Sequence, residues 1–291
     1  MLFVSYNTQF GTGRDQQVNL ERIASAVRGA DVIALQEVER HAKRTGMVDQ
    51  VAELARLLPE YHWAYGPGMD LSADGVDAFG QIIHRRRQFG NMLFSKSPLL
   101  TVRNHMLPKL GTMVQFSLQR SAVEAVIETT SGKPLRLYSL HLSHLDDTDR
   151  APQIEHLLQV HAKAYGEGAG WCGTGVYPEM TEGLAAAPMP REAILMGDFN
   201  LVSSSPLYSR IVGPLSRGHG RMNALDGLVD AWVAAGHDEA VGNTCNSALS
   251  LGKRIDFCFV SSALASGVKK AWIDEEAAGS DHQPIWTELD Y

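Results

Sequence analysis

Polar residues that bind metals or transfer protons follow several apolar runs of this sequence, at the position where each run ends. Short apolar runs are typical of buried strands, so side chains at their carboxyl ends are expected to meet along one edge of a sheet. The residues concerned are Asn7, Glu37, His141, Asp198, Asn200, Asp281 and His282. Each is weak evidence alone, and Asn7 is equally well a turn residue that closes a strand. Glu37 is more informative, because a lone carboxylate after the apolar residues 32–35 is costly to bury without a cation or hydrogen bonds.

A carboxylate and an amide stand two residues apart at Asp198 and Asn200, directly after the run at 194–197. In an extended chain, side chains two residues apart point to the same side. Such a pair can orient a water molecule and hold a phosphate oxygen. The alternative is an Asx turn that closes the strand.

An acid and a histidine near the end of the chain form a second candidate pair. Asp256 lies inside the apolar run 254–260, and Asp281 and His282 precede the last apolar run. A buried carboxylate bound to one imidazole nitrogen fixes the tautomer and favours the protonated ring, which leaves the other nitrogen free to act. We therefore pair Asp256 with His282. The alternative is a structural ion pair between Asp256 and Arg254.

Strands and a few helices are expected to position these groups. Periodicity predicts helices that contain residues 20–27, 51–58 and 154–161, the first with Asn19 as N-cap and Gly29 as its stop. Residues 131–134 read as a hairpin turn, so the strands on either side are antiparallel and the sheet is mixed. The strands are predicted near 2–7, 31–37, 90–95, 121–129, 135–142, 193–198, 254–260, 268–273 and 283–289.

One domain over residues 1–291 is the expected organisation, because no Pro/Ser linker, charge block or internal repeat divides the chain. Residues 66–88 and 165–190 are rich in Gly, Pro and Ala with weak periodicity. We interpret both segments as loop insertions. Long loops inside a compact domain are usually functional, so both are expected near the active site.

The charge and composition exclude several classes of protein. A net charge of -7 and a sequence pI near 5.9 argue against broad contact with a nucleic-acid backbone. The only compact basic run, residues 85–87, reads as a solvated loop. No apolar stretch is long enough for a membrane span, and residues 1–7 read as a strand rather than a secretory signal, so a cytoplasmic location is expected. Cys172, Cys245 and Cys258 are widely spaced and read as reduced thiols.

Taken in order, these segments resemble the endonuclease/exonuclease/phosphatase superfamily, which includes pancreatic deoxyribonuclease, apurinic endonucleases, sphingomyelinases and inositol-polyphosphate 5-phosphatases. The resemblance rests on residues 5–7, 35–38, 90–95, 139–142, 197–200, 254–257 and 280–284. It implies an α/β (α+β) fold, a four-layer sandwich of two packed mixed β-sheets flanked by helices. The active-site cleft then lies at one edge of the sandwich.

The resemblance also implies a role for each residue. Glu37 is the main ligand of Mg²⁺ or Mn²⁺, supported by Asn7 and Asp281, and oxygen donors of this kind suit a hard cation. Asp198 orients and deprotonates the attacking water. His282, held by Asp256, stabilises or protonates the charge that develops at phosphorus. The residues implied to contact the phosphate are Asn91, Arg120, His141 and Asn200.

Three positions refine the comparison with the superfamily. Arg120 matches an arginine that the deoxyribonuclease-like and sphingomyelinase-like branches place near the phosphate; the alternative is a surface charge at a strand edge. His141 matches the histidine of those branches, whereas apurinic endonucleases have tyrosine there, which argues against abasic-site repair. Cys245, after Thr244, stands where relatives often have an aromatic residue, so the pocket wall is expected to differ there.

The expected function is therefore metal-dependent hydrolysis of a phosphate ester, as a phosphodiesterase or a phosphatase. A small or lipid-derived substrate is favoured by the acidic charge, by the absence of a basic stripe and by the insertion at 165–190, which would narrow the cleft. A metal-dependent nuclease is the alternative. A third hypothesis is a binding protein that keeps the fold without turnover.

Overall fold

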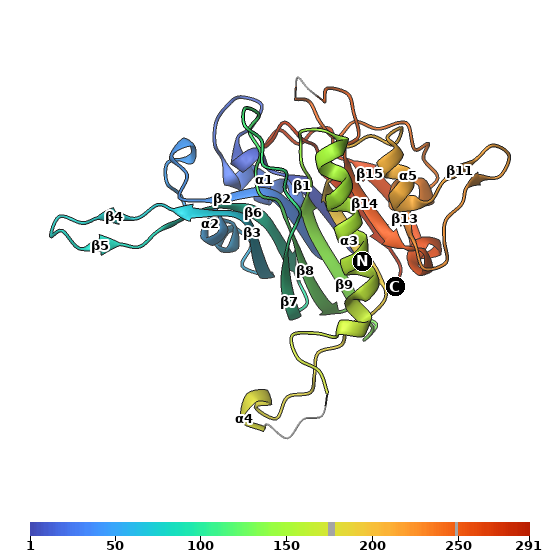
Figure 1. Cartoon of the computed structure of the whole chain (residues 1–291), viewed down its shortest axis with the longest axis horizontal. Coiled ribbons are helices and arrows are strands. Elements are labelled where there is room, and N and C mark those ends of the chain that lie inside the picture. Colours follow the sequence, from blue (N-terminus) through green and yellow to red (C-terminus); the bar gives the residue numbers. More distant parts are fainter. Residues whose placement is uncertain (174–177, 248–249) are drawn as a thin grey trace.

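Two six-stranded mixed sheets form the centre of the computed structural model, which describes residues 1–173, 178–247 and 250–291 (Figure 1). Parallel pairing of β1 with β2 and of β9 with β10, within otherwise antiparallel neighbours, makes both sheets mixed. The first sheet has the order β15 (Val268–Ile273), β16 (Ile285–Leu289), β1 (Leu2–Asn7), β2 (Val32–Arg40), β6 (Arg86–Ser95) and β3 (His62–Ser72). The second has the order β13 (Leu228–Asp230), β14 (Asp256–Ser261), β10 (Ala193–Asp198), β9 (Pro134–His141), β8 (Ser121–Glu128) and β7 (Leu99–Met106).

Helices cover the outer face of each sheet. The apolar stripe of α1 (Leu20–Val27), capped by Asn19 as predicted, packs with that of α2 (Gln50–Leu57) on the first sheet. On the second sheet, α3 (Asp147–Glu167) and α5 (Pro206–Val212) do the same, and Figure 1 shows α3 lying over β8 and β9. The remaining short elements are α4 (Pro178–Thr181), α6 (Ala231–Ala234) and the 3-10 turns η1 (Gln9–Gly11), η2 (Lys43–Thr45) and η3 (Ser262–Gly267).

The main core lies between the two sheets. Side chains such as Phe3 and Leu93 of the first sheet meet Leu137, Ile194 and Val260 of the second, and all five are buried. The order of layers is therefore helices, sheet, sheet, helices. This confirms the predicted four-layer sandwich. The hairpin predicted at 131–134 is also confirmed, because it joins the antiparallel strands β8 and β9. Among the described residues, no helix combines the length and apolarity of a membrane span.

The prediction of a loop at 66–88 was wrong. Both ends of this segment are strand, since β3 pairs with β6 from His62↔Ser95 to Ser72↔Arg86. The hairpin continues through β4 (Gly75–Val76) and β5 (Ile82–Ile83) into an arm that protrudes from the sandwich (Figure 1). A similar short hairpin joins β11 (Leu215–Ser216) to β12 (Gly220–Arg221). The strand was missed because glycine interrupts the apolar alternation by which strands are predicted. Glycine is required here because the two strands approach closely, and a Cβ at Gly90 would lie 2.3 Å from the carbonyl oxygen of Gly66.

The described residues of 165–190 lie away from the place predicted for this segment near the active site. Its first residues complete α3, which ends at Glu167, and its residues 174–177 lie outside the described residues. The segment therefore starts at the end of α3 that is remote from His141. A helix of 21 residues is about 30 Å long, so this end lies about that far from the end of α3 nearer His141. Figure 1 shows α4 at this far end of the molecule.

A buried ion cluster on the second sheet gives a prediction for stability. Glu124, 1% exposed, accepts from Arg103 Nε at 2.7 Å and Tyr138 Oη at 3.0 Å and lies 2.6 Å from His105 Nε2. Burial raises the pKa of Glu124, but His105 and Arg103 outweigh it and lower the pKa from 4.5 to about 2. The stabilisation that follows from this lowered pKa is complete above pH 4.5 and disappears as the pH falls towards 2.

We expect Glu124→Gln to lower the free energy of unfolding at neutral pH by about 3–5 kcal/mol, because the buried guanidinium of Arg136 loses the carboxylate that lies 3.6 Å away and Arg103 keeps only its bond to Glu167. The difference from wild type should shrink on acidification, as the wild-type carboxyl also becomes neutral. Urea unfolding at neutral and at acid pH measures both effects. The control is Glu128→Gln, an exposed position at the end of the same strand. A loss of stability that is the same at both pH values contradicts the prediction.

Candidate active site

Most of the predicted catalytic residues line one cavity of about 330 Å³ at an edge of the sandwich. The register of the second sheet explains why three of them meet, since Asp198 of β10 is paired with His141 of β9 on one side and with Asp256 of β14 on the other. The predicted residues that line the cavity are Glu37, Arg120, His141, Asp198, Asn200, Asp281 and His282. None of the described residues of 165–190 lines it, so the described part of that segment does not narrow the cleft.

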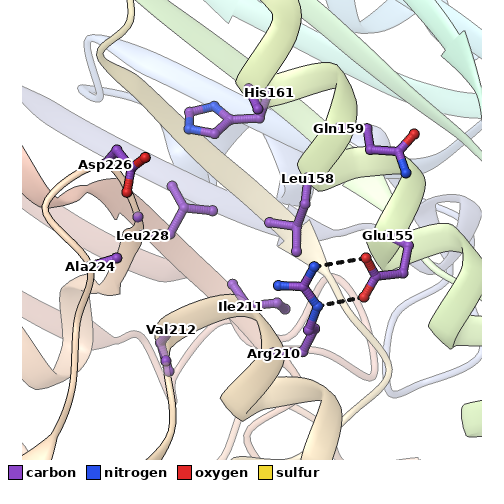
Figure 2. Close-up of a pocket in the computed structure, with 13 residues that line it drawn as sticks. Glu155, Leu158, Gln159, His161, Arg210, Ile211, Val212, Ala224, Asp226 and Leu228 are labelled. Carbon is purple, nitrogen blue, oxygen red and sulfur yellow. Dashed lines mark hydrogen bonds and ion pairs between the residues drawn. The ribbon is translucent and has the colours of Figure 1, made fainter.

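A second cavity, of about 440 Å³, lies between α3 and α5 (Figure 2). Leu158, Ile211 and Leu228 line it, and Arg210 and Glu155 at its rim are paired with each other at 2.8 Å. None of the predicted catalytic residues reaches it. The candidate site is therefore the smaller cavity, where the titratable groups converge.

Asp198 is the centre of the hydrogen-bond network in this cavity. Its Oδ1 accepts from the Asn200 amide N–H at 2.8 Å, and its Oδ2 accepts from Asn7 Nδ2 at 3.0 Å. Oδ2 also lies 3.3 Å from His141 Nε2 and 3.9 Å from His282 Nε2. Burial raises the pKa of Asp198, but these neighbours outweigh burial and lower it, so the side chain is a carboxylate at neutral pH.

Glycine at 197 brings Asp198 against the neighbouring strand. A Cβ at Gly197 would lie 1.9 Å from the carbonyl oxygen of Leu140, so no side chain fits between β10 and β9 at this point. The close approach places Asp198 beside His141. The Asx interaction that we considered as the alternative at 198–200 is present as well, through the bond from the Asn200 amide to Asp198 Oδ1.

His282 and Asp256 form the predicted buried pair, with 2.8 Å between His282 Nδ1 and Asp256 Oδ2. The alternative pairing of Asp256 with Arg254 is wrong, because Arg254 instead binds Asp230 at 2.8 Å. Burial lowers the pKa of His282, but Asp256 outweighs burial and holds it well above 6.5. Burial raises the pKa of Asp256 to about 6, which still leaves a carboxylate at neutral pH. The pair is therefore an imidazolium with its counter-ion, whose Nε2 faces Asp198.

Cys245 is part of the cavity wall. Its sulfur lies 3.6 Å from His282 Nε2 and donates to Ser247 Oγ at 3.2 Å, and the residue is buried and forms no disulfide. Thr244 just before it accepts from the amide N–H groups of Ile255 and Asp256 at 3.0 and 3.1 Å. These bonds fix the start of β14, and with it the position of the Asp256 carboxylate.

Glu37 enters the cavity from a bulge in β2. The pairing with β6 shifts between Leu35 and Val38, and Glu37 has φ 61°, a left-handed conformation that is uncommon for a residue with a side chain. Its Oε1 accepts from Asn7 Nδ2 at 3.2 Å. The amide oxygen of Asn7, the atom predicted to bind metal, instead accepts from the Gln9 amide at 3.0 Å. In this arrangement Asn7 holds the carboxylates of Glu37 and Asp198 in place.

Arg120 provides a buried positive charge beside His141. The side chain is 6% exposed, which excludes a surface charge. Its terminal nitrogens lie 2.9 Å from His141 Nδ1 and 3.2 Å from His144 Nδ1, and among the described residues its Nε has no partner. Burial lowers the pKa of His141 and of His144, and the nearby Arg120 charge lowers both further, so both rings are neutral. The guanidinium charge therefore remains available to an anion in the cavity.

His144 was missed by sequence reasoning. The H-x-x-H spacing from His141 was a usable signal, but His144 follows the strand rather than ending it. Since a guanidinium donates to Nδ1 of His141, we infer that the proton of this ring is on Nε2, where it faces Asp198 Oδ2. Asn200 Nδ2 lies 3.0 Å from the same nitrogen, and since both are donors in this tautomer, the hydrogen bond of Nδ2 is the one it donates to the carbonyl oxygen of Leu142 at 3.2 Å.

Asn91 does not reach the cavity. It is buried in β6, where its Nδ2 donates to the carbonyl oxygen of Ser121 at 2.7 Å and so ties the first sheet to the second. Among the described residues, its Oδ1 has no partner. The structure thus places Asn91 behind Arg120, rather than among the groups that line the cavity.

The carboxylates of the cavity suit a divalent cation. Burial raises the pKa of Asp281. His282 opposes this rise, while repulsion from Glu37 and Asp198 adds to it, and a cation among the three carboxylates would offset both burial and repulsion. A more compact set of ligand atoms is that of Asp198, Asp256 and His282, within 4.8 Å of one another. Its histidine already shares its proton with Asp256, so we assign that set to proton transfer rather than to metal binding.

Comparison with known proteins identifies the family of the chain. The model of the Endonuclease/Exonuclease/phosphatase family matches residues 4–282. The chain belongs to this family. The family comprises hydrolases of phosphate esters, which is the reaction class of its name. No curated protein sequence matches the chain significantly.

Solved structures of the family share the fold. The endonuclease/exonuclease/phosphatase from Beutenbergia cavernae is 20% identical, with a TM-score of 0.68 over 99% of this chain and 70% of that one. The Bacteroides vulgatus protein of the same description is 20% identical, with a TM-score of 0.66 over 99% and 98%. The catalytic domain of human Nocturnin, solved with a bound sulfate anion, is 16% identical, with a TM-score of 0.58 over 100% and 94%.

Proposed function

We propose that this chain is a divalent-metal-dependent hydrolase that cleaves a small or lipid-derived phosphate ester by in-line attack of water. The proposal rests on groups of opposite charge that face each other within one cavity. The buried guanidinium of Arg120 and the imidazolium of His282 face the carboxylates of Glu37 and Asp198. A phosphate anion and a metal cation would each find their complement there.

The chain's own residues then have distinct roles. The Asp198 carboxylate orients the attacking water and accepts its proton, while Asn200 and His141 contact the phosphoryl oxygens. Arg120 neutralises charge on the phosphoryl group. His282 donates its Nε2 proton to the leaving oxygen, and Asp256 keeps the ring oriented for this transfer.

Glu37 and Asp281 are the proposed ligands of Mg²⁺ or Mn²⁺, with Asn7 positioning the Glu37 carboxylate. When bound, the metal supplies Lewis-acid polarisation of a phosphate oxygen.

A metal-dependent nuclease is the second candidate. Arg87, from the basic run that we had interpreted as a solvated loop, belongs to β6 and lines the cavity, which favours a substrate with more than one phosphate. The absence of a narrowing insertion in the described part of the cleft also removes one argument against a nucleic acid. A single-stranded DNA substrate separates the two candidates, because DNA cleavage that is lost in Glu37→Ala would favour the nuclease.

Metal dependence is tested by chelation. We expect the purified protein to hydrolyse bis(4-nitrophenyl) phosphate or 4-nitrophenyl phosphate, to lose this activity in EDTA, and to regain it with Mg²⁺ or Mn²⁺. Release of 4-nitrophenolate measures the rate. A rate unchanged by the chelator would exclude the metal. No hydrolysis with Mg²⁺, Mn²⁺ or Ca²⁺ would favour a binding protein of the same fold.

A further inference from the structure

The lining of the cavity includes a second group of residues that the proposed reaction does not use. This group forms a wall that is apolar and largely aromatic, and two arginines, Arg44 and Arg87, border it. The apolar residues of this wall are Phe10, Met69, Phe89, Phe116 and Leu118.

Arg44 is already neutralised. It lies 2.7 Å from the Glu39 carboxylate, which is buried, and its guanidinium stacks over the ring of Phe10 at 3.8 Å from the centroid. Paired and stacked, Arg44 forms part of the wall and offers little charge to a ligand.

Arg87 is the free cation of this region. Strand alternation places it on the same face of β6 as Phe89, which also lines the cavity, while Arg86 points to the other face and pairs with Asp70 at 2.8 Å. Among the described residues, the Arg87 side chain has no hydrogen bond or ion pair. Its charge is therefore available at the rim.

We propose that Arg87 forms a second anion subsite, which binds another phosphate group of the substrate whose scissile phosphate lies at Arg120. This inference rests on the proposed function and names its substrate class, a phosphoester with an apolar or aromatic body and a further phosphate. The body lies against the aromatic wall, between the two cations. The scissile group already has Arg120 and His282 as cationic partners, so Arg87 is surplus to the reaction itself.

A subsite of this kind has a measurable signature. A guanidinium–phosphate contact is worth about tenfold in affinity, and Arg87 is exposed, so added salt should weaken the contact. The advantage of the second phosphate should therefore depend on Arg87 and fall as ionic strength rises. The matched control is Arg85, which belongs to the same run and does not line the cavity.

The test compares the 4-nitrophenyl ester of thymidine 5′-phosphate with its 3′-phosphorylated form, which differ only in the second phosphate. We expect wild type and Arg85→Gln to prefer the 3′-phosphorylated ester by about tenfold in kcat/KM, and Arg87→Gln to lose that preference while keeping its rate on the other ester. A preference that survives in Arg87→Gln, or an equal loss on both esters, overturns the subsite.

Failure of the proposed function gives a different result. If the wild type hydrolyses neither ester, the proposed function fails, and calorimetric titration of the same two compounds tests the subsite directly. Tighter binding of the 3′-phosphorylated ester that disappears in Arg87→Gln supports it. Equal binding of the two compounds to the wild type overturns it.

Discussion

Replacement of His282 by alanine is expected to lower kcat by at least about 10²-fold, which is the usual contribution of a positioned acid or base. The ring is the only group in the described part of the cavity that combines a raised pKa with a buried counter-ion 2.8 Å away. Its loss removes the proton that the leaving oxygen needs. Rates on a phosphate ester with an activated and with a poor leaving group measure the effect, which should be larger for the poor one.

The partner variant Asp256→Asn separates proton transfer from structure. Without the carboxylate, burial dominates and lowers the pKa of His282, so the protonated ring should be lost at lower pH than in wild type. The alkaline limb of the pH–rate profile is therefore expected to move towards acid. Circular dichroism and thermal unfolding establish that both variants are folded. Near-wild-type rates in folded His282→Ala, or an unmoved alkaline limb in Asp256→Asn, contradict the assignment.

Replacement of Glu37 by glutamine is expected to raise the metal concentration needed for half-maximal activity by at least about 10²-fold. Loss of a group that merely supports a ligand costs 10–100-fold, and loss of the main ligand should cost no less. Glutamine has nearly the same shape, so the bulge in β2 and the bond to Asn7 need not change. Wild type and Glu37→Gln, freed of metal with a chelator, are titrated with Mn²⁺. The hydrolysis rate and calorimetry each give the metal affinity of the two proteins.

Asn7→Ala tests the neighbouring role. If Asn7 positions Glu37, as its bonds indicate, this variant should weaken metal binding less than Glu37→Gln does. Asp281→Asn should weaken it as well, because Asp281 is the other proposed ligand. A Glu37→Gln protein with unchanged metal affinity would contradict the assignment of Glu37, and the compact set of Asp198, Asp256 and His282 would then become the candidate metal site.

Local pattern determined much of this fold. Apolar runs such as 2–7 and 193–198 became β1 and β10 with the predicted bounds, because a short, nearly continuous apolar run is typical of a strand that is buried on both faces. The missed strand β3 contains Gly66, Pro67 and Gly68, and its pairing with β6 is a contact between segments that local periodicity does not register. The missed strand β7 is an edge strand with an alternating exposed face.

The candidate catalytic residues were proposed from the sequence alone, because a carboxylate or histidine that ends a buried run is costly unless it has a partner and because the ordered segments resemble the family. The sequence also predicted one pairing, that of Asp256 with His282, and the structure has this pair at 2.8 Å. Only the tertiary structure decided the other contacts. The turn of the Asn7 oxygen towards Gln9 and the placing of Arg87 in the cavity depend on which segments fold side by side. Hydrogen bonds and charges act over a few ångströms in space, whatever their separation along the chain.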